Sequence, residues 1–245
     1  HVFTINCQDA DELCQRSIFD RSKVTCLHCG GGGIDLSRFS TNFSNDDIVK
    51  CRQDLQIDQN DFLITFIGRI VQEKGINELV EAFESLIDRR IFSVKLLVIG
   101  GVISSERDQN TAQILQKKIL SDTRLKDRIR MEGFSDEIPK YLAISDVIVL
   151  PSYREGFGMV LAEAAAMGKP VIAARTRGSE EAVDNGKTGI LIPQKDVDAL
   201  IKALDKLRTD EQLRNLLGKN GRKKALSVFS DNVIATKIDK VYETL

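Results

Sequence analysis

The sequence predicts an α/β fold in which helices cover both faces of a Rossmann-like parallel sheet. Short apolar runs rich in β-branched residues alternate with longer amphipathic segments through most of the chain, which is the pattern of repeated βα units. With 245 residues, of which 42% are hydrophobic and 29% charged, the chain is long and apolar enough to bury the core of one large or two modest domains.

The expected strands are short and mostly apolar. They cover residues 2–5, 24–27, 62–67, 94–99, 128–131, 147–150, 171–173 and 189–192. Helices are expected at residues 45–54, 76–89, 110–120, 136–144 and 157–167, and the 3.6-residue periodicity is clearest in 76–89. From Asp196 onward only helices are expected, with ends at Gly218 and Gly221 and a new start near Ser230 or Asp231.

Charge balance and apolar pattern exclude several classes of protein. A formal net charge of −1 gives no basic surface of the kind that binds nucleic acid. No apolar run approaches the roughly 18–20 residues of a transmembrane helix. The chain begins within an expected strand, without an initiator Met or a signal-like segment, so we expect it to be part of a longer protein.

All five cysteines lie near the start of the chain, at positions 7, 14, 26, 29 and 51. Their odd number and their clustering indicate reduced intracellular thiols rather than a disulfide framework. The sequence Cys26-Leu-His28-Cys29 resembles half of a zinc motif, but no second pair follows at a usable spacing. No metal site is therefore expected.

The most informative segment is a Gly-rich turn between an expected strand and an expected helix. Strand 147–150 is followed by Pro151, then by Glu155-Gly-Phe-Gly158, and then by a helix that carries Glu163. Backbone N–H groups at the start of a helix form an anion site, and glycines let a phosphate approach closely. Two carboxylates, about 12 Å apart along a helix, bracket this site. Such a layout suits a ligand with a central phosphate and hydroxyl-rich groups at both ends.

Glu163 interrupts an otherwise apolar helix. Its neighbours include Met159, Val160 and the run Ala164-Ala-Ala-Met167. An unpaired carboxylate among them would be costly, so Glu163 should have a polar partner, and a ribose diol can donate two hydrogen bonds to it. A half-exposed helix face, or pairing with a nearby Lys or Arg, explains the residue equally well at this point.

A second candidate anion site follows the expected strand 62–67. Gly68 and Arg69 come directly after that strand, and Lys74 precedes the next helix. Arg supplies a planar fork and Lys a mobile point charge, a combination that suits a diphosphate. Two solvated surface charges are the simpler interpretation of this segment alone. Because ligands bind at the carboxyl ends of parallel strands, however, the segment is expected to converge with Glu155 on one crevice.

In their order and spacing, these motifs resemble the carboxyl-terminal half of a glycosyltransferase family 4 enzyme, a retaining transferase of the GT-B type. The resemblance is carried by Gly68-Arg69, Lys74-Gly75, Gly133-Phe134, Pro151-Ser152, Glu155-Gly-Phe-Gly158 and, in an E-x7-E pattern, Glu163. It runs over nearly the whole chain, since the family's other motifs match Gly33-Ile34-Asp35, Phe39, Gly178, Glu181, Gly186 and Gly189. One departure is Gly32, where the family usually has Asn.

The resemblance implies a domain organisation. Residues 1–39 would be the tail of a second, amino-terminal Rossmann-like domain that binds the acceptor, together with the interdomain linker. Residues 40–228 would be the nucleotide-sugar-binding Rossmann-like domain, the carboxyl-terminal domain of the GT-B fold. Residues 229–245 would form a final helix that packs back toward the amino-terminal domain. The family often supplies a His near the sugar from that domain, and neither His1 nor His28 matches it in position.

The resemblance also implies roles for the candidate residues. Arg69, Lys74 and Glu155 would be the catalytic residues. The two cations would neutralise the diphosphate leaving group, and Glu155 would bind hydroxyls of the donor sugar and support the developing positive charge rather than attack as a nucleophile. Glu163 would accept hydrogen bonds from the ribose, and Phe134 would meet the base through its main chain. The implied donor-binding set is Gly68, Arg69, Lys74, Phe134, Glu155, Gly156, Phe157, Gly158, Met159, Val160 and Glu163.

The implied activity is hexosyl transfer, with retention, from a nucleotide-diphosphate sugar to a glycan or lipid-linked acceptor. The sequence Tyr153-Arg154-Glu155-Gly156 resembles the corresponding motif of bacterial enzymes that extend lipid-linked surface polysaccharides. This resemblance favours a UDP-sugar as the donor. The donor would be a substrate, and no metal or other cofactor is expected. The protein would be cytoplasmic, at the inner face of the membrane as a peripheral protein. Its partners would be the acceptor and the missing amino-terminal domain, without which the chain would be incomplete for catalysis.

Two other functions fit the same pattern. A nucleotide-sugar 2-epimerase shares the GT-B architecture and the donor site, but it performs elimination and re-addition with an acid and base pair. The E-x7-E context with Arg69 and Lys74 fits that chemistry less well. A non-catalytic nucleotide-sugar-binding module would keep the donor pocket without transfer. The intact charged residues argue against a decayed site, although a half-enzyme would behave in the same way.

Overall fold

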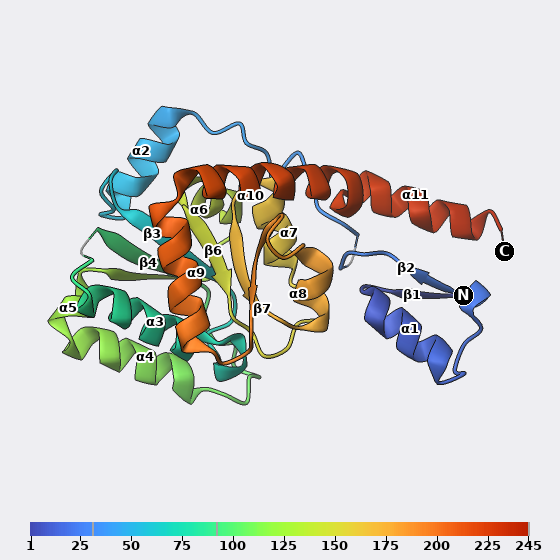
Figure 1. The fold of residues 1–245 in the computed structure, drawn as a ribbon, viewed down its shortest axis with the longest axis horizontal. Coiled ribbons are helices and arrows are strands. Elements are labelled where there is room, and N and C mark those ends of the chain that lie inside the picture. Colours follow the sequence, from blue (N-terminus) through green and yellow to red (C-terminus); the bar gives the residue numbers. More distant parts are fainter. Residues whose placement is uncertain (31, 92, 245) are drawn as a thin grey trace.

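The computed structural model describes residues 1–30, 32–91 and 93–244 and consists of a larger and a smaller part (Figure 1). The larger part is built on a six-stranded sheet, and the smaller part holds a two-stranded sheet. Helix α11 (Asp231–Tyr242) runs from the larger to the smaller part. Gly31 of the predicted Gly-rich linker and Leu245 of the predicted final helix lie outside the described residues.

All six strands of the larger sheet are parallel, in the order β5-β4-β3-β6-β7-β8. They are β3 (Phe62–Ile67), β4 (Val94–Ile99), β5 (Ile129–Gly133), β6 (Val147–Leu150), β7 (Val171–Ala174) and β8 (Gly189–Ile192). The predicted α/β fold is therefore confirmed, and β3, β4, β6 and β8 have the predicted bounds. Every residue of β3 is buried, as its unbroken apolar run indicates for a central parallel strand.

The chain builds this sheet outward in two directions. It proceeds from β3 to β4 and β5, returns across the sheet to β6, and continues to β7 and β8 on the other side. β3 and β6 are therefore the neighbouring strands at which the direction changes, and Ile64 pairs with Val147 between them. Loops that follow such a pair of strands diverge and leave a crevice, which is where ligands bind in open α/β sheets.

Helices connect the strands and cover both faces of the sheet (Figure 1). They are α2 (Asn45–Asp54), α3 (Ile76–Asp88), α4 (Asn110–Ser121), α5 (Thr123–Lys126), α6 (Ile138–Ile144), α7 (Met159–Ala166), α8 (Arg177–Ala182), α9 (Val197–Thr209) and α10 (Glu211–Lys224). A 3-10 turn, η2 (Gln72–Lys74), precedes α3, and a π-helical turn, η3 (Ala225–Phe229), precedes α11. α3 packs on α9, α2 on α6, and α7 on α10.

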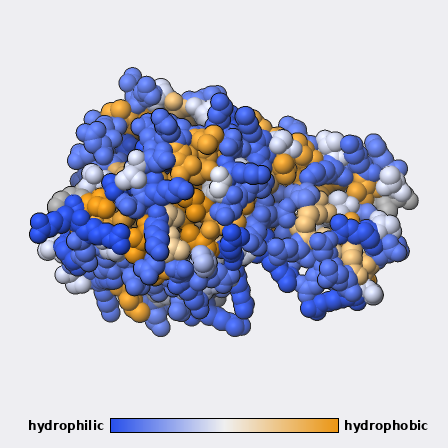
Figure 2. All heavy atoms as spheres, in the orientation of Figure 1, coloured by the Kyte–Doolittle hydropathy of each residue, from blue (hydrophilic) through white to orange (hydrophobic). Residues whose placement is uncertain are grey.

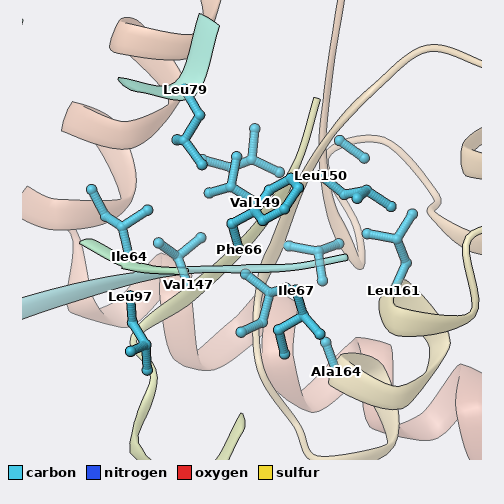
Figure 3. Packing of buried hydrophobic residues seen from close by; sticks show 14 of the residues in the cluster. Ile64, Phe66, Ile67, Leu79, Leu97, Val147, Val149, Leu150, Leu161 and Ala164 are labelled. Carbon is cyan, nitrogen blue, oxygen red and sulfur yellow. The ribbon is translucent and has the colours of Figure 1, made fainter. Parts of the chain in front are cut away.

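The core lies on both faces of β3 and β6, because side chains alternate along a strand. Ile64 and Phe66 point to the side of Leu79 in α3, whereas Ile67 points to the side of Ala164 in α7 (Figure 3). All five side chains are buried, and burying a large apolar side chain stabilises a fold by about 1.5–3 kcal/mol. The loops that follow β3 and β6 therefore start from a rigid base.

Helix α10 differs from the prediction at two glycines. Helix ends were expected at Gly218 and Gly221, but α10 continues through both of them. A Cβ added to Gly218 would lie 2.0 Å from the carbonyl oxygen of Gly168. The glycine therefore allows close packing beside the end of α7 and does not end the helix. The predicted start at Ser230 is confirmed, since its hydroxyl accepts a hydrogen bond from the N–H of Val233 at 3.3 Å.

The smaller part contains β1 (Val2–Thr4), α1 (Cys7–Gln15), the 3-10 turn η1 (Arg21–Lys23) and β2 (Val24–Cys26), with β1 and β2 parallel. The sequence does not predict α1, because most of its residues are polar. Asn6 caps α1 by accepting a hydrogen bond from the N–H of Asp9 at 2.8 Å. Its side-chain amide also donates to the carbonyl of Gly156 at 3.0 Å, which ties the smaller part to the Gly-rich turn after β6.

Hydrophilic side chains cover most of the face shown in Figure 2, and hydrophobic ones gather over the middle of the larger part. Within residues 1–30, 32–91 and 93–244, none of the helices has the combination of length and apolar character that crossing a membrane requires.

Candidate functional site

The loops that follow β3 and β6 lie against each other at the carboxyl edge of the sheet. The first loop ends at Gly75, which has a φ of 72° and where an added Cβ would lie 2.1 Å from the carbonyl oxygen of Pro151. The N–H of Tyr153 donates to the carbonyl of Glu73 at 2.8 Å. Glycine alone allows the first of these contacts. The two loops are thus held together, as the sequence predicts from their positions after neighbouring strands.

A pocket of about 610 Å³ opens between these loops. Its lining consists of Arg69, Lys74, Tyr153, Arg154, Glu155, Gly156, Thr176, Arg177 and Gln194. Four of the residues that were expected to converge therefore line one pocket: Arg69, Lys74, Glu155 and Gly156. The crevice is polar and carries several cationic side chains, so it suits an anionic ligand.

A largely buried ion pair joins the two loops inside the pocket. Lys74 Nζ lies 2.5 Å from Glu155 Oε1, and the two side chains are only 15% and 9% exposed. The pair brings a cation from the loop after β3 to a carboxylate from the loop after β6. Removing either partner would leave the other as an uncompensated buried charge. The ion pair therefore stabilises the contact between the two loops.

Arg69 lies in a more open part of the pocket, with 37% of its side chain exposed. It donates to the carboxylate of Glu106 and, at 2.8 Å, to Glu73 Oε1. The hydrogen bond to Glu106 raises the pKa of Arg69, so the guanidinium stays charged. Because Arg69 itself is open to solvent, its ion pairs are worth only about 0–1 kcal/mol, and another anion can replace the carboxylates.

The Gly-rich turn after β6 leads directly into α7. Gly158, with a φ of 77°, precedes the helix, and it provides no side-chain cap for the first N–H groups. An anion placed there would meet the N–H groups of the first turn, which includes Met159 and Val160. Phe157 is buried and its ring packs edge-on against Phe229, with the centroids 5.4 Å apart. Only its backbone is therefore free to contribute to a ligand site.

Glu163 is half-buried on α7 and lies beyond the lining of the pocket. Burial raises the pKa of this carboxyl, and the positive charge of Arg38 opposes the increase. No group in the described part of the chain donates a hydrogen bond to Glu163 or forms an ion pair with it. Pairing of Glu163 with a Lys or Arg is therefore not observed within the described residues, whereas the half-exposed helix face is observed. A ribose ligand for Glu163 stays a prediction.

Gly68 and Phe134 lie at the same edge of the sheet but outside the lining of the pocket. The N–H of Gly68 donates to the carbonyl of Ile99 at 3.0 Å, which places it between β3 and β4. The Phe134 side chain is 63% exposed, and a Cβ added to Gly101 would lie 2.8 Å from its ring. Phe134 follows the end of β5, which is two strands away from β3, the strand before Lys74, and three strands away from β6, the strand before Glu155.

Five pocket residues were not predicted as site residues: Tyr153, Arg154, Thr176, Arg177 and Gln194. Burial, and then a hydrogen bond to Glu78, raise the pKa of Tyr153, so its hydroxyl stays protonated and serves as a donor. The last three follow the ends of β7 and β8. Their positions after β7 and β8 are the signal for them in the sequence, because ligands bind at the carboxyl ends of parallel strands.

Comparison with known proteins identifies relatives of the chain. The family model described as glycosyl transferases group 1 matches residues 47–224. The capsular polysaccharide biosynthesis glycosyltransferase CapM of Staphylococcus aureus is 34% identical over 224 residues, covering 91% of this chain and 56% of CapM. The UDP-Gal:alpha-D-GlcNAc-diphosphoundecaprenol alpha-1,3-galactosyltransferase of Escherichia coli is 29% identical over 231 residues, covering 94% of this chain and 56% of that enzyme. The chain thus spans about half the length of these curated relatives.

Solved structures share the fold. Anabaena Alr3699/HepE, whose crystal structure is a complex with UDP and glucose, superposes with a TM-score of 0.86 at 24% identity. The superposition covers 100% of this chain and 63% of that chain. At this level of identity the likeness shows the fold alone, and it matches the parallel sheet flanked by helices.

Proposed function

We propose that this chain, which belongs to the group 1 glycosyl transferases, binds the nucleotide-diphosphate sugar from which the sugar is transferred to an acceptor. The observation that carries the proposal is the convergence of Lys74, Glu155 and Arg69 on one pocket at the point where the strand order reverses. A pocket at this position of a parallel sheet is where α/β proteins bind nucleotides.

The diphosphate is assigned to the cationic side of the pocket. Arg69 would exchange its carboxylate partners for phosphate oxygens, to which its planar guanidinium can donate two parallel hydrogen bonds. Lys74 adds a point charge on the same side. Because the diphosphate gains negative charge as the bond to the sugar breaks, fixed cations there stabilise the transition state more than the bound donor. The N–H groups at the start of α7 would complete the phosphate site.

The hydroxyl-rich ends of the donor are assigned to the two carboxylates. Glu155 accepts one hydrogen bond from Lys74 and keeps a second oxygen for hydroxyls of the sugar. Glu163 is half-buried and has no protein donor within the described residues, which suits a carboxylate that accepts hydrogen bonds from a ribose diol. We further propose that Phe134 meets the base and that transfer occurs with retention, without a metal, as in family 4.

UDP is the proposed nucleotide part of the sugar donor, because the related Escherichia coli enzyme is named for UDP-Gal. A lipid-linked or other glycan is the proposed acceptor, since the same name includes a diphosphoundecaprenol and CapM is named for capsular polysaccharide biosynthesis. In this proposal the enzyme works at the inner face of the membrane. Residues 1–39 and 229–245 belong with an amino-terminal acceptor domain, and residues 40–228 bind the donor.

The proposal is tested by measuring how the protein binds and converts labelled sugar donors. UDP-glucose, UDP-galactose and UDP-N-acetylglucosamine, each labelled with 13C in the sugar, are incubated with the protein and an undecaprenyl-diphosphate-linked sugar. NMR then reports on binding and on the anomeric and C2 carbons. We expect saturable binding of at least one donor and no change of configuration at C2. Inversion at C2 would establish the epimerase instead. Absence of binding for all three, and for the GDP and ADP analogues, would overturn the donor assignment.

A further inference from the structure

A second cluster of reactive side chains lies outside the pocket, where the smaller part meets α8. Cys7 begins α1, Cys26 ends β2, His28 follows β2, and Glu181 lies in α8. One ligand atom from each residue can be chosen so that all four atoms lie within 4.8 Å of one another. Three separate segments of the chain therefore bring two sulfurs, an imidazole and a carboxylate to one point.

Direct contacts hold this cluster together. His28 Nδ1 lies 2.6 Å from Glu181 Oε1, and the backbone N–H of Cys7 donates to Glu181 Oε2 at 2.8 Å. The sulfur of Cys7 is 3.4 Å from His28 Nδ1 and 3.8 Å from Nε2. His28 adopts a left-handed backbone conformation, with a φ of 60°, which residues other than glycine seldom take. The backbone thus holds the imidazole between the two sulfur-bearing elements and α8.

We propose that Cys7, Cys26, His28 and Glu181 form a zinc site. Zinc is typically bound in a tetrahedron by Cys, His and carboxylate ligands, with Zn–S bonds of about 2.3 Å and Zn–N bonds of about 2.0–2.1 Å. Such bonds place sulfur and nitrogen about 3.6 Å apart. Only one ring nitrogen of His28 can bind the ion, and the distances from the Cys7 sulfur, 3.4 Å to Nδ1 and 3.8 Å to Nε2, each lie within about 0.2 Å of that value. Two sulfur ligands disfavour Mg²⁺ and Ca²⁺, which prefer oxygen.

The spacing in the sequence hides this site. Cys26, His28 and Cys29 suggested half of a motif, but Cys29 turns away, is fully buried and lies with its sulfur 3.8 Å from the carbonyl of Phe229. The remaining ligands, Cys7 and Glu181, come from positions 21 residues and 153 residues away from His28. Only the packing of α1 and α8 against the end of β2 brings them together.

The proposed ion would fasten the smaller part to the larger one beside the pocket. α8, which carries Glu181, begins at Arg177, and both Arg177 and the preceding Thr176 line that pocket. Zinc is thus a structural ion in this proposal, and it positions one wall of the pocket without taking part in the chemistry. The proposal does not depend on the identity of the donor.

Zinc binding is measured on the whole chain after reduction and removal of metal with a chelator. Titration with Co²⁺, and then displacement by Zn²⁺ in competition with a chromogenic chelator, should show one ion per chain and the absorption of cobalt bound to thiolates. Cys26→Ser and His28→Ala should each weaken zinc affinity by at least about 100-fold, more than the loss of an outer-shell partner. Cys14→Ser is the matched control, because Cys14 lies on α1 outside the cluster, and it should bind zinc like the wild type.

Other outcomes overturn the proposal. Zinc affinity that is unchanged by Cys26→Ser, or no stoichiometric zinc with reduced protein, would show that the cluster is not a metal site. A disulfide between Cys7 and Cys26 that forms in air despite an equivalent of zinc would show the same. Glu181→Gln keeps the shape of the side chain, so it should weaken zinc binding without unfolding the chain, as circular dichroism would verify. Unchanged zinc affinity in that folded variant would remove Glu181 from the site.

Discussion

The two cations of the pocket stand in different surroundings. Lys74 and Glu155 are 15% and 9% exposed, and a single contact of 2.5 Å joins them. Arg69 is 37% exposed and divides its donors between Glu106 and Glu73, which are 16% and 46% exposed. The difference separates two tasks. The buried pair holds the loops after β3 and β6 in register, whereas Arg69 is the cation that can exchange its partners for a diphosphate.

Breaking the buried pair should have the largest effect. Lys74→Ala or Glu155→Ala should each lower the free energy of unfolding by about 3–5 kcal/mol, because each leaves an unpaired charge in a closed environment. Urea denaturation followed by circular dichroism measures the loss. The double variant Lys74→Met with Glu155→Leu leaves no charge behind and should lose less than either single variant. A loss below about 1 kcal/mol in the single variants would show that solvent screens the pair.

Glu163 should make donor binding depend on pH. Burial raises its pKa above the ordinary value of 4.5, so the folded chain holds a proton that the unfolded chain has released. The protonated Glu163 carboxyl therefore contributes to stability. This contribution is fully present below pH 4.5 and is lost as the pH rises through the raised pKa. Ribose hydroxyls donate to the ionised form, so donor affinity should instead rise over the same interval.

UDP-glucose is the appropriate probe, since its diphosphate does not titrate there. Calorimetric titration between about pH 4.5 and 7 should show that the affinity of the wild type for UDP-glucose rises with pH, whereas the affinity of Glu163→Gln should not rise. At neutral pH, Glu163→Gln should bind UDP-glucose more weakly than the wild type by about 1.5–3 kcal/mol. The same pH dependence in both proteins would place the ribose elsewhere.

The smallest effect is expected at Glu106. Glu106→Gln removes a carboxylate that competes with phosphate for Arg69, so UDP should bind more tightly by up to about 1 kcal/mol. The matched control is Glu132→Gln, since Glu132 is similarly shielded, at 19% exposure, and pairs with Arg130 outside the pocket. Weaker binding by Glu106→Gln alone would show that Glu106 positions Arg69 rather than competing for it.

The sequence predicts the centre of the molecule well because the signals there are local. β3 and β6 are short apolar runs, and Arg69, Lys74 and Glu155 lie in the loops that follow them. Knowing that parallel strands end at one edge is enough to bring these residues together. Their partners are harder to foresee. Glu106 reaches Arg69 from a loop between β4 and α4. The hydrophobic periodicity that predicts helices and strands does not predict a contact made from a loop.

Two other features show where local signals fail. Gly218 indicates a helix end, yet it serves the close approach of α10 to Gly168. Glycine is suited both to ending a helix and to close packing between helices, so only the packing in the structure shows which role Gly218 has. The cluster around His28 likewise depends on α1, a short helix of mostly polar residues, and on Glu181 far along the chain.

Calorimetric titration with UDP tests most directly whether Arg69 is the exchangeable cation of a donor pocket. Arg124→Ala is the matched control, because Arg124 is a half-exposed arginine with two carboxylate partners, Asp122 and Asp88, outside the pocket. We predict that the wild type and Arg124→Ala bind one UDP with equal affinity. Arg69→Ala should bind at least about tenfold more weakly, a loss of roughly 1.5–3 kcal/mol. Equal affinity in all three proteins would contradict the assignment of the diphosphate to this pocket.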